Sequence, residues 1–461
     1  MPEYYFGIIM GAFNLSQMIS SPVFGYWLDR RPMKEVVVFC MVIGAVGNTC
    51  YALAPNIYVV LLGRLISGAG GNIYNTGMTY VVRVSEPEER SALYAKINLI
   101  YYMGMLFGPA LNYPLSLLGR YQFGLFTVDA LSAPGLLMVF MLAFAVVFVH
   151  FAFEEPVHHE EEPETENSEE AEAIAAADAK CCGLAKYKPL FNSFTLVAVI
   201  MLQFVVQFNQ ISLETIVTPV TKMWFGYGQL ENSVIYAIIT AIFFFWFFAI
   251  IFISKKVQDR TLIVIGAVWF GASFGFSVGW VYSNPQPDVY AMPLYAFAIS
   301  VSMVVSGIPF FLSSISSLFS KLIGNKKIQG MGQSMLGAAN SLANILGPVI
   351  SGIVLPRVDV LFAVLLGTWV LIMVLLFARW SALYTDPAGR MRQIDEKVSP
   401  KGSPSSSSPL GDPSSPRSER EVEETLLRKP RAMSNSFKDY VEQGLVPARA
   451  PPGSIQDHDL A

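Results

Sequence analysis

Long apolar stretches are the feature of this sequence that most restricts its fold. Crossing the hydrocarbon core of a bilayer takes about 20 mostly apolar residues in one helix. Over the chain of 461 residues, 53% are hydrophobic and 14% are charged, which excludes an ordinary soluble domain. Eleven stretches of suitable length cover residues 5–27, 35–54, 57–83, 91–118, 131–153, 193–221, 232–254, 261–283, 289–319, 328–355 and 360–383. We therefore expect an all-α membrane protein with eleven transmembrane helices.

Lysine and arginine are concentrated in alternate loops, which predicts the orientation. One set of loops holds Arg30, Arg31, Lys34, Arg83, Arg90, Lys180, Lys186, Lys188, Lys255, Lys256, Arg260, Lys321, Lys326 and Lys327. The other set holds only Arg120, Lys222 and Arg357. Because cytosolic loops carry the excess of basic residues, we expect the first set and the C-terminus on the cytosolic side. The N-terminus is then lumenal or extracellular.

A strongly acidic segment divides the membrane part in two. Residues 154–190 contain the run EEPVHHEEEPETENSEEAEA, which is typical of a solvated, largely disordered cytosolic linker. It separates a first half-bundle, residues 1–153, from a second, residues 191–384. The Ser- and Pro-rich composition of residues 385–461 predicts a disordered cytosolic tail.

The segment GYWLDRRPMK, residues 25–34, joins the first two apolar stretches. Gly25 and Asp29 are four residues apart and share one helix face, where the glycine lets a second helix come close. Asp29, Arg30 and Lys34 fall at the water boundary, where the carboxylate can meet an arginine or a helix end. A plain basic loop between two membrane helices is the alternative.

Two short signals recur in both halves of the sequence. Asp29–Arg30 follows the first stretch, and Asp259–Arg260 follows the seventh. Gly108–Pro109 in the fourth stretch is matched by Gly347–Pro348 in the tenth, at a similar offset. Tandem halves would explain this, and a chance pairing of dipeptides is the alternative. In this register the first half lacks the opening helix of a six-plus-six bundle, so we expect the upstream genomic region to encode it.

These signals resemble the motifs of the major facilitator superfamily. Its pattern Gly-x-x-x-Asp-Arg-x-Gly-Arg-Arg, between helices 2 and 3, is matched by Gly25, Asp29, Arg30 and Lys34, whereas Pro32 and Met33 depart from it. The resemblance implies a helical bundle that moves a small solute by alternating access. It also implies that this loop controls the conformational change.

Two further helices carry similar motifs. Arg64, Gly68 and Gly70 resemble the Arg-x-x-x-Gly-x-Gly pattern of the superfamily's helix 4, and Gly104, Gly108 and Pro109 resemble the close-packing pattern of its helix 5. The stretches MISSPVFGYW, RLISGAGGN, LETIVTPVT and ANILGPV resemble the lysosomal members associated with ceroid lipofuscinosis. This closer resemblance implies a lysosomal or late-endosomal membrane, with anions such as chloride among the candidate solutes.

Charged residues within the apolar stretches are candidates for coupling, because a charge near the bilayer centre costs about 2.5–3.5 kcal/mol. The superfamily resemblance marks Arg64 as coupling-related, and the alternative is an arginine that reaches the lumenal interface. Glu214 lies five residues before Pro219, a proline that can loosen the helix. Its alternative is a structural partner of a neighbouring polar group.

Amide side chains recur at helical spacing. They are expected either to line a cavity or to form interhelical hydrogen bonds of about 0.6 kcal/mol each. The set comprises Asn14, Gln17, Asn72, Asn75, Gln203, Gln207, Gln210, Asn340 and Asn344. The aromatic run at residues 243–248 is expected to face lipid or to pack. The sequon Asn14-Leu15-Ser16 lies inside the first stretch, so no N-glycan is expected.

The sequence contains no motif of an enzyme or of a nucleotide or metal site. Phosphate-binding glycine loops, nucleophile elbows and metal-spaced His/Cys sets do not occur. We expect no enzymatic activity, no cofactor, no metal and no nucleic-acid partner. The expected partners are the lipid bilayer and a small-molecule or ion substrate, with sorting adaptors at the dileucine-like Leu426 and Leu427. A secondary active transporter is the expected function, and a channel-like anion conductance or a non-transporting scaffold or sensor is the alternative.

Overall fold

The computed structural model describes residues 4–116, 119, 121–123, 126–130, 132–155, 187–283, 292–378 and 380–383. Most of the acidic linker and the whole tail, with Leu426 and Leu427, lie outside the described residues.

The first half-bundle follows the predicted apolar stretches to within a few residues. Its helices are α1 (Tyr4–Leu28), α2 (Met33–Ala52), α3 (Ile57–Gly70), α4 (Ile73–Val84), α5 (Arg90–Ser116) and α6 (Ala133–Ala152). Between α5 and α6 the chain forms a short antiparallel hairpin of β1 (Tyr121–Phe123) and β2 (Phe126–Val128), with Tyr121 opposite Val128. The all-helical prediction missed this hairpin, whose aromatic and β-branched residues favour extended backbone.

The third apolar stretch forms two helices rather than one, with a break between Gly70 and Ile73. Gly70 packs on the backbone of α2, where a Cβ would lie 2.6 Å from the backbone nitrogen of Gly44. Gln17 of α1 donates a hydrogen bond from Nε2 to the carbonyl oxygen of Gly71 at 3.0 Å. The side chain thus satisfies a backbone acceptor at the break.

In the described part of the second half-bundle, six helices have 20 residues or more and one has five. They are α8 (Lys188–Asn192), α9 (Phe194–Phe225), α10 (Gln229–Ile253), α11 (Asp259–Ser283), α12 (Leu294–Ile323), α13 (Gln329–Val354) and α14 (Val358–Phe377), with short 3₁₀ turns at Lys326–Ile328, Leu355–Arg357 and Trp380–Leu383. In the described part of the chain, eight helices are long and apolar enough to cross a membrane. The predicted helical membrane class is confirmed, whereas the predicted count of eleven spans is not.

Prolines lie inside α9, α12 and α13 without ending these helices. Pro219 was expected to be able to loosen its helix, yet α9 runs through it from Phe194 to Phe225. Within a bundle, neighbouring helices and polar side chains satisfy the carbonyl groups that a proline leaves free.

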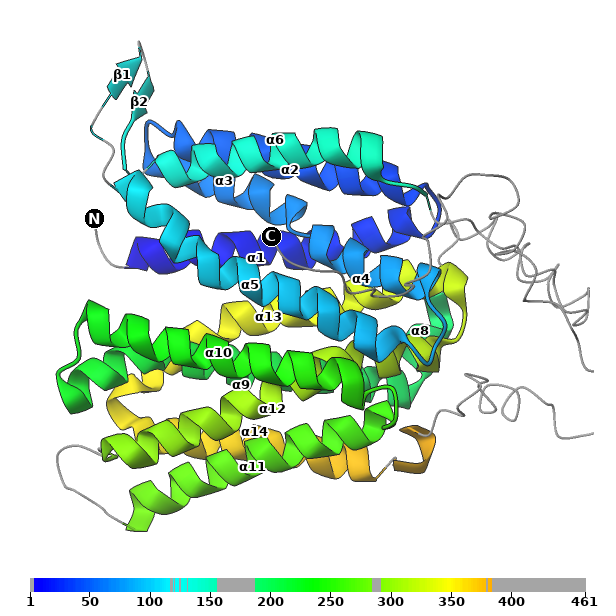
Figure 1. Ribbon diagram of the computed structural model, residues 1–461, viewed down its shortest axis with the longest axis vertical. Helices are drawn as coiled ribbons and strands as arrows, with labels where there is room; N and C mark the ends of the chain where they lie inside the picture. Colours follow the sequence, from blue (N-terminus) through cyan, green and yellow to red (C-terminus); the bar gives the residue numbers. More distant parts are fainter. Residues whose placement is uncertain are drawn as a thin grey trace, which may run out of the picture. The chain divides into compact units, whose positions relative to one another are not determined.

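Helices of the two halves pack directly against each other. Figure 1 shows α1 beside α13, and α5 lies against both α10 and α12. Within the second half, α9 packs on α13, and α11 packs on α12 and α14. Of the candidate spans, α12 is the most buried, with 67% of its most apolar window inside the protein, against 6% for α6. Hence α12 lies in the core and α6 is left to face lipid.

Candidate functional site

The loop at residues 25–34, here called the Asp29 loop, holds the N-terminus of α13. The Asp29 carboxylate accepts hydrogen bonds from the backbone N–H groups of Gly330 at 2.7 Å and Met331 at 3.0 Å. Both groups belong to the first turn of α13, where no helical carbonyl is available to them. The carboxylate also faces the positive end of the helix dipole. Asp29 therefore meets a helix end, one of the two partners considered from the sequence, and joins the two half-bundles.

Glycines let α1 and α13 come this close. A Cβ at Gly25 would lie 2.7 Å from the Cβ of Ser334, and a Cβ at Gly330 would lie 2.5 Å from Oδ1 of Asp29. Side-chain atoms do not approach one another this closely, so even alanine at either position would push the helices apart.

Residues at both ends of the acidic linker contact the Asp29 loop. Glu155, which follows α6, accepts hydrogen bonds from the backbone N–H groups of Met33 and Lys34, the second at 3.0 Å. Tyr187, which precedes α8, donates its hydroxyl proton to Oδ2 of Asp29 at 3.2 Å. Burial, together with the nearby Asp29 carboxylate, raises the pKa of Tyr187, so the phenol remains a neutral donor.

The basic residues around the Asp29 loop make local contacts. The Arg30 guanidinium lies 4.2 Å from the centre of the Tyr26 ring. Lys34 donates from Nζ to the carbonyl oxygen of His150 at 2.7 Å. These contacts fix the shape of the loop that presents Asp29.

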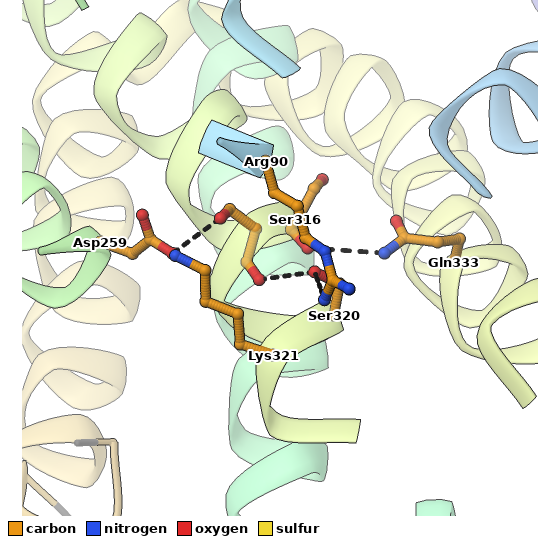
Figure 2. A network of polar contacts seen from close by, with 7 residues as sticks. Arg90, Asp259, Ser316, Ser320, Lys321 and Gln333 are labelled. Carbon is orange, nitrogen blue, oxygen red and sulfur yellow. Dashed lines mark hydrogen bonds and ion pairs between the residues drawn. The ribbon is translucent and has the colours of Figure 1, made fainter. Parts of the chain in front are cut away.

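The matching aspartate of the second half makes different contacts (Figure 2). Asp259 accepts hydrogen bonds on Oδ2 from Ser317 Oγ and Lys321 Nζ, each at 2.7 Å, and its side chain is 2% exposed. Arg90, the first residue of α5, donates from Nη1 to Ser320 Oγ at 3.3 Å. These residues, here called the Asp259 cluster, tie α5 of the first half to α12 of the second.

The aspartates of the two Asp-Arg pairs are therefore alike in sequence but not in contacts. Asp29 caps the backbone of α13, whereas Asp259 pairs with the side chain of Lys321 on α12. Arg260 lies apart from this pair, with its guanidinium 5.2 Å from the centre of the Trp380 ring. Separating the half-bundles at this end would break both the Asp29 contacts and the bond of Arg90.

A cavity of about 330 Å³ lies between α9, α10 and α12, and Tyr102 of α5 reaches it from the first half. Its lining is mostly apolar and aromatic, and its size is that of a small-molecule site. The polar lining side chains are Tyr102, Gln210, Glu214, Ser233, Tyr236, Thr240 and Ser300. Among the described residues, no group of three or more His, Cys, Asp or Glu side chains could hold a metal ion.

Glu214 carries the one charge in the described lining of this cavity. Gln210, one turn earlier on α9, donates from Nε2 to the Tyr102 hydroxyl at 3.0 Å. The Tyr236 hydroxyl of α10 donates to the backbone carbonyl oxygen of Glu214 at 3.4 Å. The carboxylate thus lies among neutral polar groups and faces a space that a solute can occupy.

Sequence reasoning missed the aromatic part of the lining. Phe243 lines the cavity and is 7% exposed, whereas Phe245, in the same aromatic run, is 65% exposed. A helical periodicity within residues 243–248 was the available signal, because positions three or four apart share a face.

Most of the predicted amide residues on α9 and α13 bridge the two helices. Gln203 donates from Nε2 to Asn340 Oδ1 at 2.6 Å, and Gln207 donates to Asn344 Oδ1 at 3.0 Å. Of the two roles considered from the sequence, these four residues therefore form interhelical hydrogen bonds and do not line the cavity. Gln210 is the member of the set that lines the cavity.

The amides of the first half bind a neighbouring helix. Asn72 accepts a hydrogen bond from Ser21 of α1 at 2.5 Å and donates one to Ser20 at 2.8 Å. Asn75 donates to Asn72 Oδ1 at 3.2 Å and lies directly against Gly337 of α13. They too form interhelical contacts, away from the cavity.

Arg64 lies outside the cavity lining. Its guanidinium is 4.3 Å from the centre of the Tyr51 ring, a cation–π contact that joins α3 to α2. Its Nε is buried and has no hydrogen-bond partner.

The predicted packing glycines divide into two groups. Gly68 lies against the backbone of Phe13, Gly70 against α2, and Gly347 against Ile211 of α9, so each sits at a close helix crossing. The structure does not place Gly104 at the close helix contact predicted for it, because no described atom lies within 4 Å of a Cβ placed there. Pro348 lies within α13; the surroundings of Gly108 and Pro109 in α5 are outside the described residues.

Comparison with known proteins gives consistent matches. The family model of the Major Facilitator Superfamily matches residues 2–322. Major facilitator superfamily domain-containing protein 8 of Xenopus laevis is 25% identical over 399 residues, which cover 75% of this chain and 77% of that protein. Quinolone resistance protein NorA of Staphylococcus aureus is 22% identical over 351 residues, which cover 75% of this chain and 79% of that protein.

Solved structures share the fold. The human organic anion transporter MFSD10 superposes with a TM-score of 0.60 at 16% identity, covering 80% of this chain and 83% of that chain. The proton:xylose symporter XylE gives a TM-score of 0.60 at 13% identity, and the superposition covers 82% of this chain and 86% of that chain. At these identities the likeness concerns the fold alone.

Proposed function

Because this chain belongs to the major facilitator superfamily, we propose that it is a secondary active transporter that moves a small solute by alternating access. The observation that carries the proposal is the cavity around Glu214, which lies apart from the Asp29 loop and the Asp259 cluster. Such a cavity can bind a solute while the Asp29 loop and the Asp259 cluster hold one end of the bundle closed.

Helix α12 connects these two regions. Phe297, Ser300 and Val304 in its first half line the cavity, whereas Ser317 and Lys321 near its end belong to the Asp259 cluster. At about 1.5 Å per residue, the two regions are roughly 20 Å apart along one helix. A movement of α12 that opens the cluster would therefore also alter the cavity.

Glu214 is our candidate for the coupling residue. Neutral side chains surround it in the cavity, so the carboxylate is free to take up a proton or to bind a cation during the cycle. The superfamily resemblance also assigns a coupling role to Arg64, and we propose that this arginine acts through its contact with α2 rather than on the solute.

The cellular setting is also part of the proposal. Resemblance of several sequence stretches to lysosomal superfamily members supports a lysosomal or late-endosomal membrane, and the distribution of basic residues supports a cytosolic C-terminus. The chloride conductance considered from the sequence would give a current that scales linearly with voltage, whereas a carrier gives saturable flux. A scaffold or sensor would show neither.

The test begins by comparing metabolites in purified organelles with and without the protein, which identifies the solutes it moves. The full chain in proteoliposomes should then show saturable flux of such a solute that depends on an imposed proton or cation gradient. Glu214→Gln should keep the protein folded but remove this dependence. Glu231→Gln, which alters an acid outside the cavity lining, is the matched control. Flux by Glu214→Gln with unchanged dependence would remove Glu214 from the mechanism.

A further inference from the structure

The one charged side chain in the described lining of the cavity is acidic. Glu214 contributes a carboxylate, and the described lining contains no lysine, arginine or histidine. The other titratable side chains in this lining are Tyr102 on α5 and Tyr236 on α10, and a phenol carries no charge at neutral pH. A bound anion would therefore meet a like charge without a compensating cation, whereas a bound cation would meet its counter-ion.

Several aromatic rings line the same cavity as the carboxylate. Tyr102 and Phe243 stack with ring centres 4.7 Å apart, and both line the cavity. Phe274 and Phe297 line the cavity from α11 and α12. Aromatic faces attract cations as well as apolar groups, and the combination of several rings with one acid is the usual way to hold an organic cation.

A second hydrogen-bond acceptor lies one turn from Glu214. Gln210 uses its Nε2 on the Tyr102 hydroxyl, while its Oε1 is buried and accepts no hydrogen bond. A buried acceptor without a donor is costly. Gln210 lines the cavity, so a rotation of its amide would turn this oxygen toward a solute whose N–H groups also pair with the Glu214 carboxylate.

We infer that the cavity binds a protonated amine with a compact apolar body, and this inference rests on the proposed function of the same site. The ammonium group lies against Glu214, with one N–H directed to Gln210 Oε1. The hydrocarbon part packs on Phe243, Phe274 and Phe297. Amines of this class fit the cavity of about 330 Å³, and carboxylates of the same shape are excluded by charge.

The test uses three probes that each carry a phenyl ring on a four-carbon chain and differ in the polar group at its end: phenylbutylamine, phenylbutanol and phenylbutyrate. Binding to the purified full chain in detergent is measured by titration calorimetry at neutral pH, with empty micelles titrated in parallel. We expect the amine to bind at least about tenfold more tightly than the alcohol, because it adds a charge-assisted hydrogen bond. The carboxylate should bind more weakly than either.

Variants of Glu214 test whether this residue causes the preference for the amine over the alcohol. Glu214→Gln should bring the amine and the alcohol to equal affinity, and Glu214→Asp, which keeps the charge, should restore part of the difference. Glu231→Gln should behave as wild type. The inference is wrong if the carboxylate probe binds most tightly, or if a folded Glu214→Gln protein keeps the full preference for the amine.

The inference and the transport proposal can fail separately. Amine binding that depends on Glu214, without amine flux in proteoliposomes, supports the site and contradicts transport. Saturable flux of an anion or a neutral solute, with no Glu214-dependent amine binding, supports transport and overturns the amine site.

Discussion

Replacing Asp29 by asparagine should open the end of the bundle that the Asp29 loop closes. The carboxylate makes two backbone hydrogen bonds with α13, at 2.7 and 3.0 Å. Asparagine has one side-chain carbonyl oxygen, so it keeps at most one of them and loses the charge that faces the helix dipole. Loss of one charge-assisted hydrogen bond costs about 1.5–3 kcal/mol, and loss of the charge–dipole term about 0.3–1 kcal/mol. We expect the free-energy difference between the closed and open states to change by about 2 kcal/mol or more in favour of the open state. This is roughly a 30-fold change in the ratio of closed to open states.

A cysteine at Ser334 can report this opening. Ser334 is 3% exposed and lies beneath Gly25, so its accessibility depends on separation of α1 from α13. In a background without native cysteines, Ser334→Cys should react with a maleimide at least tenfold faster when Asp29→Asn is added. Glu35→Gln, which removes an exposed acid in the first turn of α2, is the control. Equal labelling rates for Asp29→Asn and Glu35→Gln would refute the idea that the Asp29 contact holds the bundle closed.

Three further outcomes are expected. Gly25→Ala should lower the melting temperature by an amount equivalent to about 1–3 kcal/mol through overpacking against α13, whereas Gly77→Ala, where no described atom lies within 4 Å of the added Cβ, should not. Lys321→Met should destabilise the protein by about 3 kcal/mol because it leaves the Asp259 charge buried and unpaired, and adding Asp259→Asn should recover most of the loss, as measured by thermal unfolding of the single and double variants. Deglycosidase treatment should leave the gel mobility unchanged, since Asn14 lies within α1, and a mobility shift would contradict the placement of this helix in the membrane.

The sequence predicted the features that depend on local spacing. Membrane helices follow from the length of apolar stretches, and the common face of Gly25 and Asp29 follows from helical geometry. The recurrence of Asp-Arg pointed to a matching position in the second half. It could not predict that Asp259 pairs with Lys321, because that contact depends on which residue of α12 lies opposite.

The cavity could not be predicted in the same way. Spacing shows that Gln203, Gln207 and Gln210 lie on neighbouring parts of α9, but not what each one faces. In the structure the first two reach α13, and the third reaches Tyr102 of α5. The difference arises from the crossing of α9 with two partner helices, which is a tertiary property.

The contacts of Glu155 and Tyr187 have a consequence for the chain that runs between them. Both residues bind the Asp29 loop, so this segment leaves and returns at nearly the same place. For a solvated linker, the entropy of closing such a loop depends on the logarithm of its length, and each doubling costs only about 0.6 kcal/mol. An epitope or a small folded reporter inserted midway should therefore leave the Asp29 loop in place. We therefore expect changes of length here to cost little stability, and substitutions of Glu155 or Tyr187 to disturb the Asp29 loop.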